Sequence, residues 1–560
     1  MGNVSKQKRD DLVAKIKEIR TFIAGVAQDE NTESLLSYLS ELEKDVRGKK
    51  FGLVFEEHCE AIDEKLETHI PVLKEEKDLF IDNGGQLNFL IEGDNLAALQ
   101  LLEKTHKGDV DVIYIDPPYN TGAKDWKYDN DYVDKNDTFR HSKWLSLMEK
   151  RIIVAKKLLS PRGAFICAID ENEFPTISLL LESIFGDAYE IHYIVVVHNP
   201  GGTQGKNFSY THEYVIFVLS KGEKIIGLQN RIDNPDIRPL RDVSTGNHLR
   251  INAKNCFYPI YVKDGEIVGF GEVCDDDFHP EAANVLREDG ILEIYPIDPS
   301  GNERKWVFAR QSVESIKGDL VVSFNKKRKI WDIVRHKTKF TYKTFWNDKE
   351  YNSNIFGTKL LKEIIPNCSF NFPKSLYAVK DCVNAIITSR KNPVILDFFA
   401  GSGTTGHAVL KLNTEDNSKQ RRFILCTNNE NNICKDVTYE RIKRVIDRDG
   451  YEASLKYYRI DFIPISERLY YEYADELLLH VRELVELENG VNFVSNLEVA
   501  IVLTDDDLAE FIGNINEFEK CNKLYIGHNV LPNGEQQDTL KKARITVNVI
   551  PNYYYNELGV

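Results

Sequence analysis

The sequence alternates short apolar segments with segments of helical periodicity, and no other feature limits the possible folds as much. Five apolar segments of strand length lie in the first half of the chain: Leu87–Ile91, Val110–Ile115, Ala164–Ile169, Tyr193–Val197 and Tyr214–Leu219. Helical spacing of apolar residues separates the first three, at 96–104 and 143–159, and Ser160–Gly163 is expected to form a turn. Such alternation is typical of a mostly parallel sheet whose strands are joined by crossover helices. The expected fold class is therefore α/β.

The alternation stops between about 225 and 350. Within this stretch, glycine, asparagine and aromatic residues interrupt short β-prone pieces such as Phe257–Val262 and Leu320–Phe324. The pattern then resumes with a strand, a helix and a strand: 394–399, 404–412 and 422–427. One α/β domain interrupted by an insertion explains this order better than three separate domains.

We expect five parts in all: an N-terminal helical arm (1–50), the first part of the α/β domain (51–224), the insertion (225–350), the second part of the domain (351–464) and a C-terminal α/β extension without an assigned role (465–560). Apolar residues of the arm recur every three or four positions over 8–48, which predicts a pair of helices. The pair either packs on the main body or serves as an oligomerisation or partner-binding arm. The sequence leaves both interpretations open.

A glycine-rich loop, Asp397-Phe-Phe-Ala-Gly-Ser-Gly-Thr-Thr-Gly406, follows a predicted strand and opens a predicted helix. Gly401 and Gly403 allow a tight turn and let a ligand approach the backbone, while Gly406 lets the helix pack closely. Glu430, at the end of the next strand, is placed to bind ribose hydroxyls. Because NAD, FAD and S-adenosylmethionine (SAM) all bind to such loops, this loop alone predicts a nucleoside-containing cofactor without identifying it.

A second loop, Asp116-Pro-Pro-Tyr119, directly follows the apolar strand Val110–Ile115. Ligands of a parallel sheet gather at the carboxyl ends of its strands, so Asp116 is expected at the ligand-binding edge. Pro117 and Pro118 fix the backbone and prevent a helix from starting there. An acid, two prolines and Tyr119 together form a rigid clamp suited to a planar amine.

Together the two loops resemble the amino-methyltransferases that modify exocyclic nitrogens of DNA bases. The catalytic loop precedes the glycine loop, as in the permuted β group of these enzymes. Four longer strings resemble the modification (Mod) subunits of type III restriction–modification systems: Gly93–Leu99, Asp116–Gly122, Asn354–Lys359 and Asp397–Thr405. The resemblance covers about 86–445. It implies a SAM-dependent methyltransferase with a Rossmann-like sheet and an inserted target-recognition domain.

The resemblance implies adenine N6 as the methylated atom, because Asp and not Ser stands at position 116. Asp116 and the carbonyl of Pro117 would accept hydrogen bonds from the amine, which is electrostatic preorganisation more than strong base catalysis. Tyr119 would stack on a base that has left the duplex. Methylation of cytosine N4 and a non-catalytic DNA-specificity subunit stay open as alternatives. An oxidoreductase dependent on NAD or FAD would leave the loop Asp116–Tyr119 unexplained.

The same resemblance implies SAM as the cofactor. The residues expected to contact SAM are Asp94, Phe372, Lys374, Asp397, Phe399, Gly401, Gly403, Thr404 and Glu430. Asp94 would lie near the adenine ring of SAM, while Phe372 and Lys374 belong to the segment that family members place over the methionine moiety. Methyl transfer from a sulfonium requires no metal, and none of the nine cysteines forms a Cys-x-x-Cys pair, so no metal site is expected.

The insertion contains a strongly basic stretch at 324–343. Eight Lys and Arg occur in it with Asp332 as the single acidic residue, although the whole chain has a formal net charge of −16. Interleaved aromatic residues suit phosphate contact combined with stacking. The residues expected to bind DNA are Lys326, Lys327, Arg328, Lys329, Arg335, Lys337, Lys339 and Lys343. The acidic total then restricts where DNA binds without excluding DNA as a partner.

The partners expected from the resemblance are double-stranded DNA, a second copy of the chain and a separate restriction helicase–nuclease subunit. An orphan methyltransferase that acts alone is equally compatible with the sequence. No apolar run approaches the roughly 18 residues that a membrane span needs, and the amino terminus has no apolar signal region. The expected location is the cytoplasm.

Overall fold

A computed structural model describes residues 4–25, 30–47, 55–128, 131–134, 136–231, 235–326, 329–368, 370–388, 390–415, 420–465, 477, 479–493, 498–527 and 530–550. The chain forms two compact units. The first unit comprises Met1–Glu223, Thr344–Lys380 and Lys391–Val560, and the second comprises Lys224–Lys343 and Asp381–Arg390. Apart from Lys224 and its last segment, the second unit lies within the predicted insertion, while 344–350 belong to the first unit.

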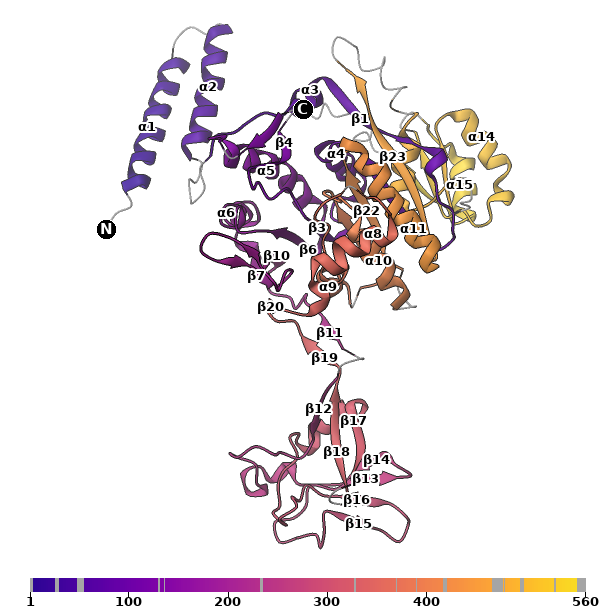
Figure 1. The fold of residues 1–560 in the computed structure, drawn as a ribbon. Coiled ribbons are helices and arrows are strands. Elements are labelled where there is room, and N and C mark those ends of the chain that lie inside the picture. The colour runs from indigo at the N-terminus through magenta and orange to yellow at the C-terminus, as the bar shows by residue number, and fades with distance from the viewer. Residues whose placement is uncertain are drawn as a thin grey trace. The chain divides into compact units, whose positions relative to one another are not determined.

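A ten-stranded sheet organises the first unit (Figure 1). In spatial order its strands are β1 (His69–Glu75), β23 (Ala453–Pro464), β2 (Gln86–Glu92), β22 (Arg422–Thr427), β21 (Val394–Asp397), β3 (Val110–Ile115), β6 (Leu159–Ile169), β10 (Glu213–Ser220), β7 (Tyr189–Val196) and β20 (Phe345–Trp346). The pairing is antiparallel where β1 meets β23 and where β10 meets β6 and β7, and parallel at the other neighbours. The predicted mostly parallel α/β fold is confirmed.

Helices connect the strands of this sheet. They are α3 (Ala61–Thr68), α4 (Asn95–His106), α5 (Arg140–Leu158), α6 (Phe174–Phe185), α8 (Leu360–Ile364), α9 (Leu376–Ile387), α10 (Thr404–Glu415) and α11 (Glu440–Asp449). Short 3₁₀ or π turns are η1 (Lys77–Leu79), η2 (Gly186–Ala188), η6 (Lys349–Tyr351), η7 (Asn354–Lys359), η8 (Glu430–Asn432) and η9 (Ile433–Tyr439). Two small hairpins complete this part: β4 (Ala123–Tyr128) with β5 (Asp131–Asp134), and β8 (Thr203–Gln204) with β9 (Ser209–Tyr210).

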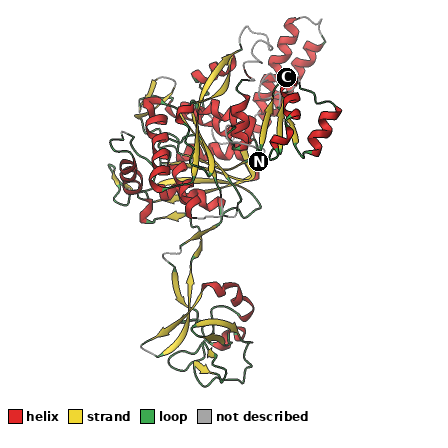
Figure 2. Ribbon diagram, turned by 90° about the vertical axis from the view of Figure 1, so that its right-hand side faces the viewer, coloured by secondary structure: helices red, strands yellow, loops and turns green. Residues whose placement is uncertain are grey.

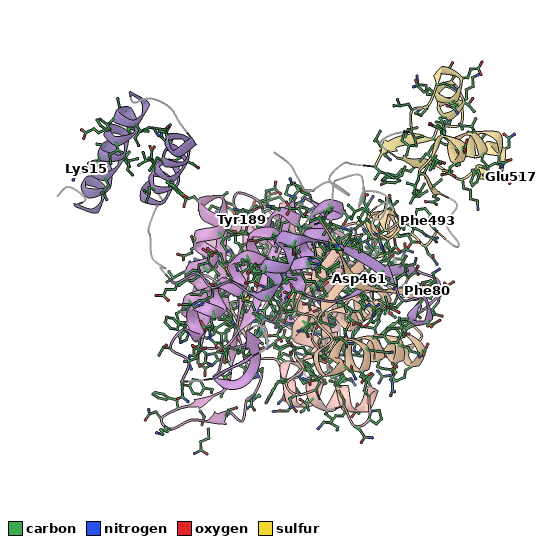
Figure 3. All side chains as sticks on the ribbon, turned by 90° about the horizontal axis from the view of Figure 1, so that it is seen from above. Lys15, Phe80, Tyr189, Asp461, Phe493 and Glu517 are labelled. Carbon is green, nitrogen blue, oxygen red and sulfur yellow. The ribbon has the colours of Figure 1, made fainter. Side chains whose placement is uncertain are left out.

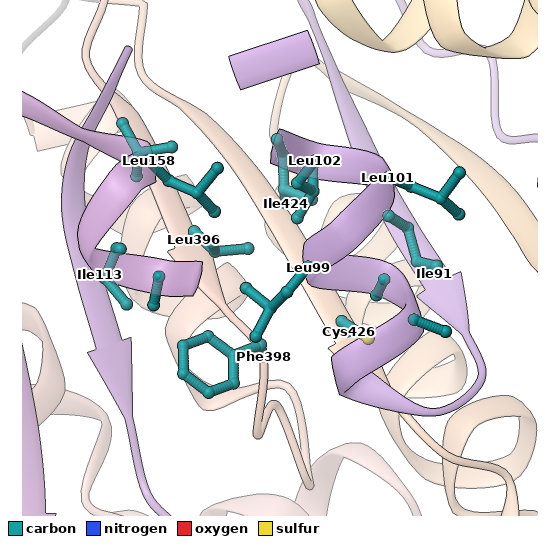
Figure 4. Close-up of a cluster of buried hydrophobic side chains, with 14 of the residues drawn as sticks. Ile91, Leu99, Leu101, Leu102, Ile113, Leu158, Leu396, Phe398, Ile424 and Cys426 are labelled. Carbon is teal, nitrogen blue, oxygen red and sulfur yellow. The ribbon is translucent and has the colours of Figure 1, made fainter. Parts of the chain in front are cut away.

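The core of this unit lies between the central strands and the helices that cover them (Figure 4). Leu99 and Leu102 of α4 are fully buried in the same cluster as Leu396 of β21 and Ile424 of β22. Leu158 of α5 belongs to this cluster as well. Apolar side chains at helical spacing on α4 therefore fix the position of the strands whose carboxyl ends carry the two loops.

The neighbouring strands β3 and β21 come from distant parts of the sequence. Ile395 pairs with Val112 and Leu396 with Ile113, in parallel register. The chain continues from β3 to β6 on one side and from β21 to β22 on the other, so the sheet order reverses between β3 and β21. Ligands of open α/β sheets bind at such a reversal point.

The expectation of a turn at Ser160–Gly163 is wrong. These residues lie inside β6, which pairs with Val110 at Leu159 and, after a register shift, with Val112 at Ala164. The extra residues form an irregularity within the strand, as a bulge does. A Cβ added to Gly163 would lie 2.9 Å from the carbonyl oxygen of Val110, so the glycine permits a close backbone approach and does not end the strand.

The second unit is built mainly from short strands (Figure 2). They form a pair, β11 (Leu228–Asn230) with β19 (Lys339–Thr341); a three-stranded sheet, β12 (Asp236–Pro239), β18 (Ile330–Lys337) and β17 (Leu320–Asn325); and a four-stranded sheet, β14 (Glu266–Phe270), β13 (Ile260–Lys263), β16 (Leu292–Ile294) and β15 (Asn284–Leu286). Its helical turns are η3 (Arg250–Asn252), η4 (Lys254–Cys256), α7 (Arg310–Val313) and η5 (Glu314–Asp319). Tyr258, Trp306 and Ile333 are fully buried in a core of its own.

The N-terminal arm forms the predicted helices α1 (Val4–Ala24) and α2 (Glu30–Arg47) (Figure 3, which labels Lys15 of α1). Ile16 and Leu39 are buried, whereas Phe22 and Tyr38 are mostly exposed. The two interpretations of the arm stay predictions. No described helix is both long enough and apolar enough to cross a membrane.

The C-terminal extension contains α13 (Val481–Asn489), β24 (Val499–Val502), α14 (Asp505–Gly513), η10 (Ile515–Phe518), β25 (Lys523–Ile526), α15 (Gly534–Lys542) and β26 (Thr546–Val549). Its three strands form a parallel sheet. Val481 and Val485 of α13 are buried in the main core, and Glu486 Oε2 accepts a hydrogen bond at 2.5 Å from the buried Lys456 Nζ of β23. Helix α13 therefore joins the core of the α/β domain, whereas Val502, Leu508 and Leu524 belong to a separate cluster of the extension.

Candidate active site

Four adjacent strands end at one cavity of 510 Å³ in the first unit. Residues that follow β2, β3, β21 and β22 line it together with α3 and α5: Glu60, Gly93, Asp94, Asn95, Asp116, Pro117, Pro118, Leu147, Arg151, Phe398, Phe399, Gly401, Thr427, Glu430 and Ile433 among them. A smaller cavity of 70 Å³ shares Asp116, Phe399 and Gly401 with the first. It also touches Phe372, Lys374, Asp397 and Thr404. The catalytic and glycine loops thus meet at the same edge of the sheet.

The glycine loop has the backbone conformation that its glycines permit. Gly401 and Gly403 have φ angles of +48° and +73°, which residues other than glycine rarely adopt. The carboxylate of Asp397 accepts hydrogen bonds from Phe399 N at 3.0 Å and from Thr405 Oγ1 at 2.5 Å. Burial raises the pKa of Asp397 to about 7, although the hydrogen bond from Thr405 opposes the rise. This carboxyl group is therefore poised to change its charge near neutral pH.

A fully buried arginine supports the loop from α11. Arg441 Nη1 donates to Ser402 O at 3.2 Å and to Thr404 Oγ1 at 2.8 Å. Thr438 Oγ1 donates to Gly401 O at 2.6 Å. The hydroxyl of Thr404 is therefore engaged with Arg441, although Thr404 also lines the smaller cavity.

The predicted acids Asp94 and Glu430 and the further acid Glu60 differ in their surroundings on the cofactor side. Asp94 caps α4, because its Oδ1 accepts from Leu96 N at 2.7 Å, and its Oδ2 lies 3.3 Å from Arg151 Nη2. Glu60 binds the buried guanidinium of Arg151 through both oxygens, at 2.7 and 3.1 Å. Glu430, just beyond β22, is exposed at the cavity. Of these three acids, Asp94 and Glu430 are suited to bind ribose hydroxyls and an amine.

Hydrogen bonds with Trp144, Glu173 and Glu213 fix the catalytic loop and Asn120, the residue that follows it. Trp144 Nε1 of α5 donates to Pro118 O at 2.7 Å. Asn120, with a φ of +54°, donates through Nδ2 to the buried Glu173 Oε1 at 2.5 Å. Tyr119 OH donates to Glu213 Oε2 at 2.9 Å. The backbone of the loop and the ring of Tyr119 are therefore fixed by the fold.

Lys374 places an ammonium group in the middle of this loop. Its Nζ lies 3.2 Å from Asp116 Oδ1 and 2.5 Å from Glu213 Oε2, contacts Tyr119 OH, and is 4.4 Å from the centroid of the Tyr119 ring. Burial raises the pKa of Asp116 to about 6, and Lys374 limits the rise. Burial also disfavours the charge of Glu213, but Lys374, His198 and the hydrogen bond from Tyr119 together outweigh burial, and the pKa of Glu213 is lowered. Burial alone would lower the pKa of Lys374, yet Asp116 and Glu213 raise it above its ordinary value.

The predicted site residues therefore fall into three groups. The larger cavity is lined by Asp94, Asp116, Pro117, Pro118, Phe399, Gly401 and Glu430, and the smaller one also by Phe372, Lys374, Asp397 and Thr404. Tyr119 and Gly403 line neither cavity, since Tyr119 faces Glu213 and Gly403 packs beside Thr438. Phe372 is 90% exposed, with a φ of +61°. The roles of all these predicted site residues toward a ligand stay predictions.

Glu213 and Trp144 are site residues that were not predicted from the sequence. Glu213 begins β10, which is antiparallel to β6, and Tyr214 pairs with Ile169 at the end of β6. The amino end of an antiparallel strand reaches the same edge as the carboxyl ends of its parallel neighbours. An acid immediately before the apolar segment Tyr214–Leu219 was the signal that could have found it.

The basic stretch of the second unit has mixed surroundings. Arg335 binds Asp319, with Nη2–Oδ2 at 2.8 Å, and Lys337 Nζ lies 4.9 Å from the centroid of the Phe340 ring. Lys326, Lys329, Lys339 and Lys343 are exposed. Lys327 and Arg328 lie outside the described residues. Arg335 thus has an internal partner within this unit.

Comparison with known proteins supports an enzymatic site. The model of a family described as DNA methylase matches residues 110–440, which is more than half of the chain. The type II methyltransferase M.KpnI of Klebsiella pneumoniae is 30% identical over 355 residues, 60% of this chain and 79% of that protein.

Two Mod subunits of type III restriction–modification enzymes are similar to the chain. EcoPI Mod of Escherichia phage P1 is 28% identical over 62% of this chain and 58% of its own length, and StyLTI Mod of Salmonella typhimurium is 29% identical over 66% and 57%. The chain therefore spans somewhat more than half the length of these subunits. The predictions of a methyltransferase and of SAM as its cofactor are confirmed, and the chain belongs to the DNA methylase family of SAM-dependent enzymes.

Proposed function

We propose that the chain methylates adenine N6 within a specific sequence of double-stranded DNA, as the modification subunit of a type III restriction–modification system. The supporting observation is that Asp116, followed by two prolines and Tyr119, lines both cavities at the edge that also carries the glycine loop. An acceptor and an aromatic ring beside a cofactor cavity suit transfer to a planar amine. The similarity to Mod subunits supports the assignment to type III systems.

The two cavities, which share Asp116, Phe399 and Gly401, together fit SAM. The larger one combines the acidic Asp94 and Glu430 with the apolar Phe399 and the open backbone at Gly401, and Asp397 lines the smaller one. The carboxylates would bind the ribose hydroxyls and adenine amine, Phe399 would cover the adenine, and Asp397 would attract the ammonium of the methionine moiety. When bound, SAM supplies an electrophilic methyl group on its sulfonium.

Asp116 acts on the target base. With a pKa of about 6, it is mostly ionised at neutral pH, so its carboxylate accepts a hydrogen bond from the N6 amine. This contact would favour the tetrahedral nitrogen that forms as the methyl–sulfur bond breaks and leaves a thioether; the nitrogen would then lose one proton, which the carboxylate of Asp116 or water accepts. Tyr119 stacks on the flipped base, and the prolines hold both groups in place. The loop thereby lowers the cost of orienting the amine toward the methyl donor.

The test is methylation of duplex DNA by wild type, Asp116→Ala and, as a control, Glu171→Gln, which changes an exposed acid beyond the loop. We expect N6-methyladenine at one sequence with wild type and the control, and none with Asp116→Ala. N4-methylcytosine would identify the cytosine alternative instead. Undiminished methylation by Asp116→Ala would show that Asp116 has no catalytic role. The family match leaves no observation in favour of an NAD or FAD oxidoreductase.

The second unit would recognise the DNA sequence. Phe324 and Trp331 lie opposite each other on β17 and β18, their ring centroids are 4.9 Å apart, and both are about 40% exposed. Exposed Lys326 and Lys329 lie at the tip of this hairpin. Basic side chains around an aromatic pair suit phosphate contact and base contact. Exchanging 224–343 for the corresponding segment of a relative should change the methylated sequence; an unchanged sequence would refute this role.

As such a subunit, the chain would bind a separate restriction subunit and a second copy of itself. It would do so in the cytoplasm. Co-expression with a restriction subunit encoded beside this chain should give a complex that cleaves unmodified DNA, and sedimentation should give twice the chain mass of 64.4 kDa. Cleavage without the second protein, or a monomer that is fully active, would contradict these assignments.

A further inference from the structure

The ammonium of Lys374 occupies the position that the proposed function assigns to the target amine. It is 3.2 Å from Asp116 Oδ1, a hydrogen-bonding distance, and 4.4 Å from the centroid of the Tyr119 ring. A flipped adenine needs the same carboxylate oxygen for its amine and the same aromatic ring for stacking. The lysine and the base therefore compete for both contacts.

Glu213 gives the lysine a second partner. Glu213 Oε2 is 2.5 Å from Lys374 Nζ, and its side chain is only 6% exposed. If the ammonium leaves Asp116, it keeps a charge-assisted contact with Glu213, so displacement does not strand a buried charge. Glu213 also accepts from Tyr119 OH at 2.9 Å, which keeps the ring in place during the exchange.

We propose that Lys374 is a positioning residue that holds the place of the target base in the empty site and yields it to the base while remaining bound to Glu213. The inference rests on the proposed function, because it assumes that Asp116 and Tyr119 receive the flipped base. It assigns Lys374 to the target side of the site, in addition to the cofactor side that the resemblance implies. To enter the site, the target base must therefore displace the ammonium of Lys374 from Asp116 and from the ring of Tyr119.

The lysine also sets the charge of the site. With Lys374 present, two carboxylates share one ammonium, which favours ionised Asp116. Without it, Asp116 and Glu213 would be like charges in a buried site, and one of them would hold a proton at neutral pH. Other titratable groups near this cluster are Asp170, His198, Cys167 and Asp397. None of them replaces the ammonium at Asp116 in the described structure.

The experiment compares wild type with Lys374→Met, Lys374→Gln and Lys374→Arg. The matched control is Lys380→Met. Lys380 lies on α9, and its Nζ is paired at 3.0 Å with a carboxylate oxygen of Glu415, at the end of α10. Base flipping is followed by the fluorescence of 2-aminopurine placed at the target adenine, and methyl transfer by single-turnover rates from pH 5 to pH 9. SAM affinity is measured in parallel.

For Lys374→Met and Lys374→Gln we expect the 2-aminopurine fluorescence to be at least about twofold that of wild type, because the base no longer competes with the ammonium. The acid limb of the rate profile should move up by about one pH unit, because Asp116 loses the charge that keeps it ionised. Lys374→Arg should keep the acid limb of wild type. The control should change neither quantity.

Three results would overturn the proposal. Weaker SAM binding by Lys374→Gln with unchanged fluorescence and pH profile would make Lys374 a cofactor ligand only. Equal loss of rate at every pH in all three variants, with unchanged fluorescence, would show a merely structural role. Absence of N6-methyladenine from wild type would remove the proposed function itself, and this inference with it.

Discussion

The two loops that meet at the cavity are stabilised in different ways. In the glycine loop, Asp397 accepts from Phe399 and from Thr405, which are two and eight residues away along the chain. Thr438 and Arg441, 37 to 39 residues away, donate to uncharged oxygens of the same loop. The partners of the catalytic loop are 26 to 258 residues distant, and one of them is an ammonium shared by two carboxylates. The cofactor side is thus shaped by local conformation and by hydrogen bonds from one later segment, and the target side by charges that the tertiary fold brings together.

The largest expected effect comes from breaking the charged network at Glu213. In Glu213→Leu, Tyr119 loses its acceptor and Lys374 has only Asp116 left, so the ammonium should hold Asp116 against the base. Since truncating one partner of a buried ion pair costs about 3–5 kcal/mol, we expect single-turnover methylation to fall about 100-fold or more. Isothermal titration should give an unchanged SAM affinity.

Glu213→Gln keeps the size of the side chain and an acceptor for Tyr119, and it should lose less activity. A large loss of SAM affinity in Glu213→Leu, with full methylation at saturating SAM, would contradict the division between the two loops.

The next effect concerns the conformation of the glycine loop. Gly403→Ala places a Cβ on a residue with φ of +73°, 3.3 Å from Thr438 Cγ2. A strain of roughly 1–2 kcal/mol should weaken SAM binding about tenfold and leave the single-turnover rate at saturating SAM unchanged. The control Gly318→Ala adds a Cβ that meets no atom within 4 Å. Equal effects of both substitutions on SAM binding would refute a special role of the loop conformation.

This difference between the loops also explains what the sequence could predict. The strands and crossover helices follow apolar periodicity, and the turn of the glycine loop follows its glycines and the nearby hydrogen bonds of Asp397; their positions agree with expectation to within a few residues. The bulge in β6 and the partners Trp144 and Glu213 depend on strand pairing and on packing between distant segments. A pattern along one chain can mark a candidate acid, such as Glu213 before an apolar run, but it does not show which groups that acid contacts until the neighbouring strands are known.

A third, smaller effect is the pH dependence of SAM binding. Burial raises the pKa of Asp397 to about 7, so its protonated form dominates below that pH. If the ionised form attracts the ammonium of SAM, SAM affinity is highest well above pH 7 and decreases as the pH falls through 7. Lowering the pH from 8 to 6.2 should weaken SAM binding about sevenfold. Asp397→Asn should bind SAM more weakly at high pH, with little pH dependence; an unchanged pH dependence in this variant would assign it to another group.

The smallest effect tests a neutral support of the catalytic loop. In Trp144→Phe the aromatic volume largely remains in the core, but the 2.7 Å hydrogen bond from Nε1 to Pro118 O is lost. Because a neutral hydrogen bond contributes about 1 kcal/mol, the methylation rate should fall about fivefold, with SAM affinity unchanged. Single-turnover rates at saturating SAM and DNA measure this loss. If Trp144→Phe lowered the rate as much as Glu213→Leu does, the carbonyl of Pro118 would matter as much as the charged network, and the contrast between local and electrostatic support would no longer hold for this loop.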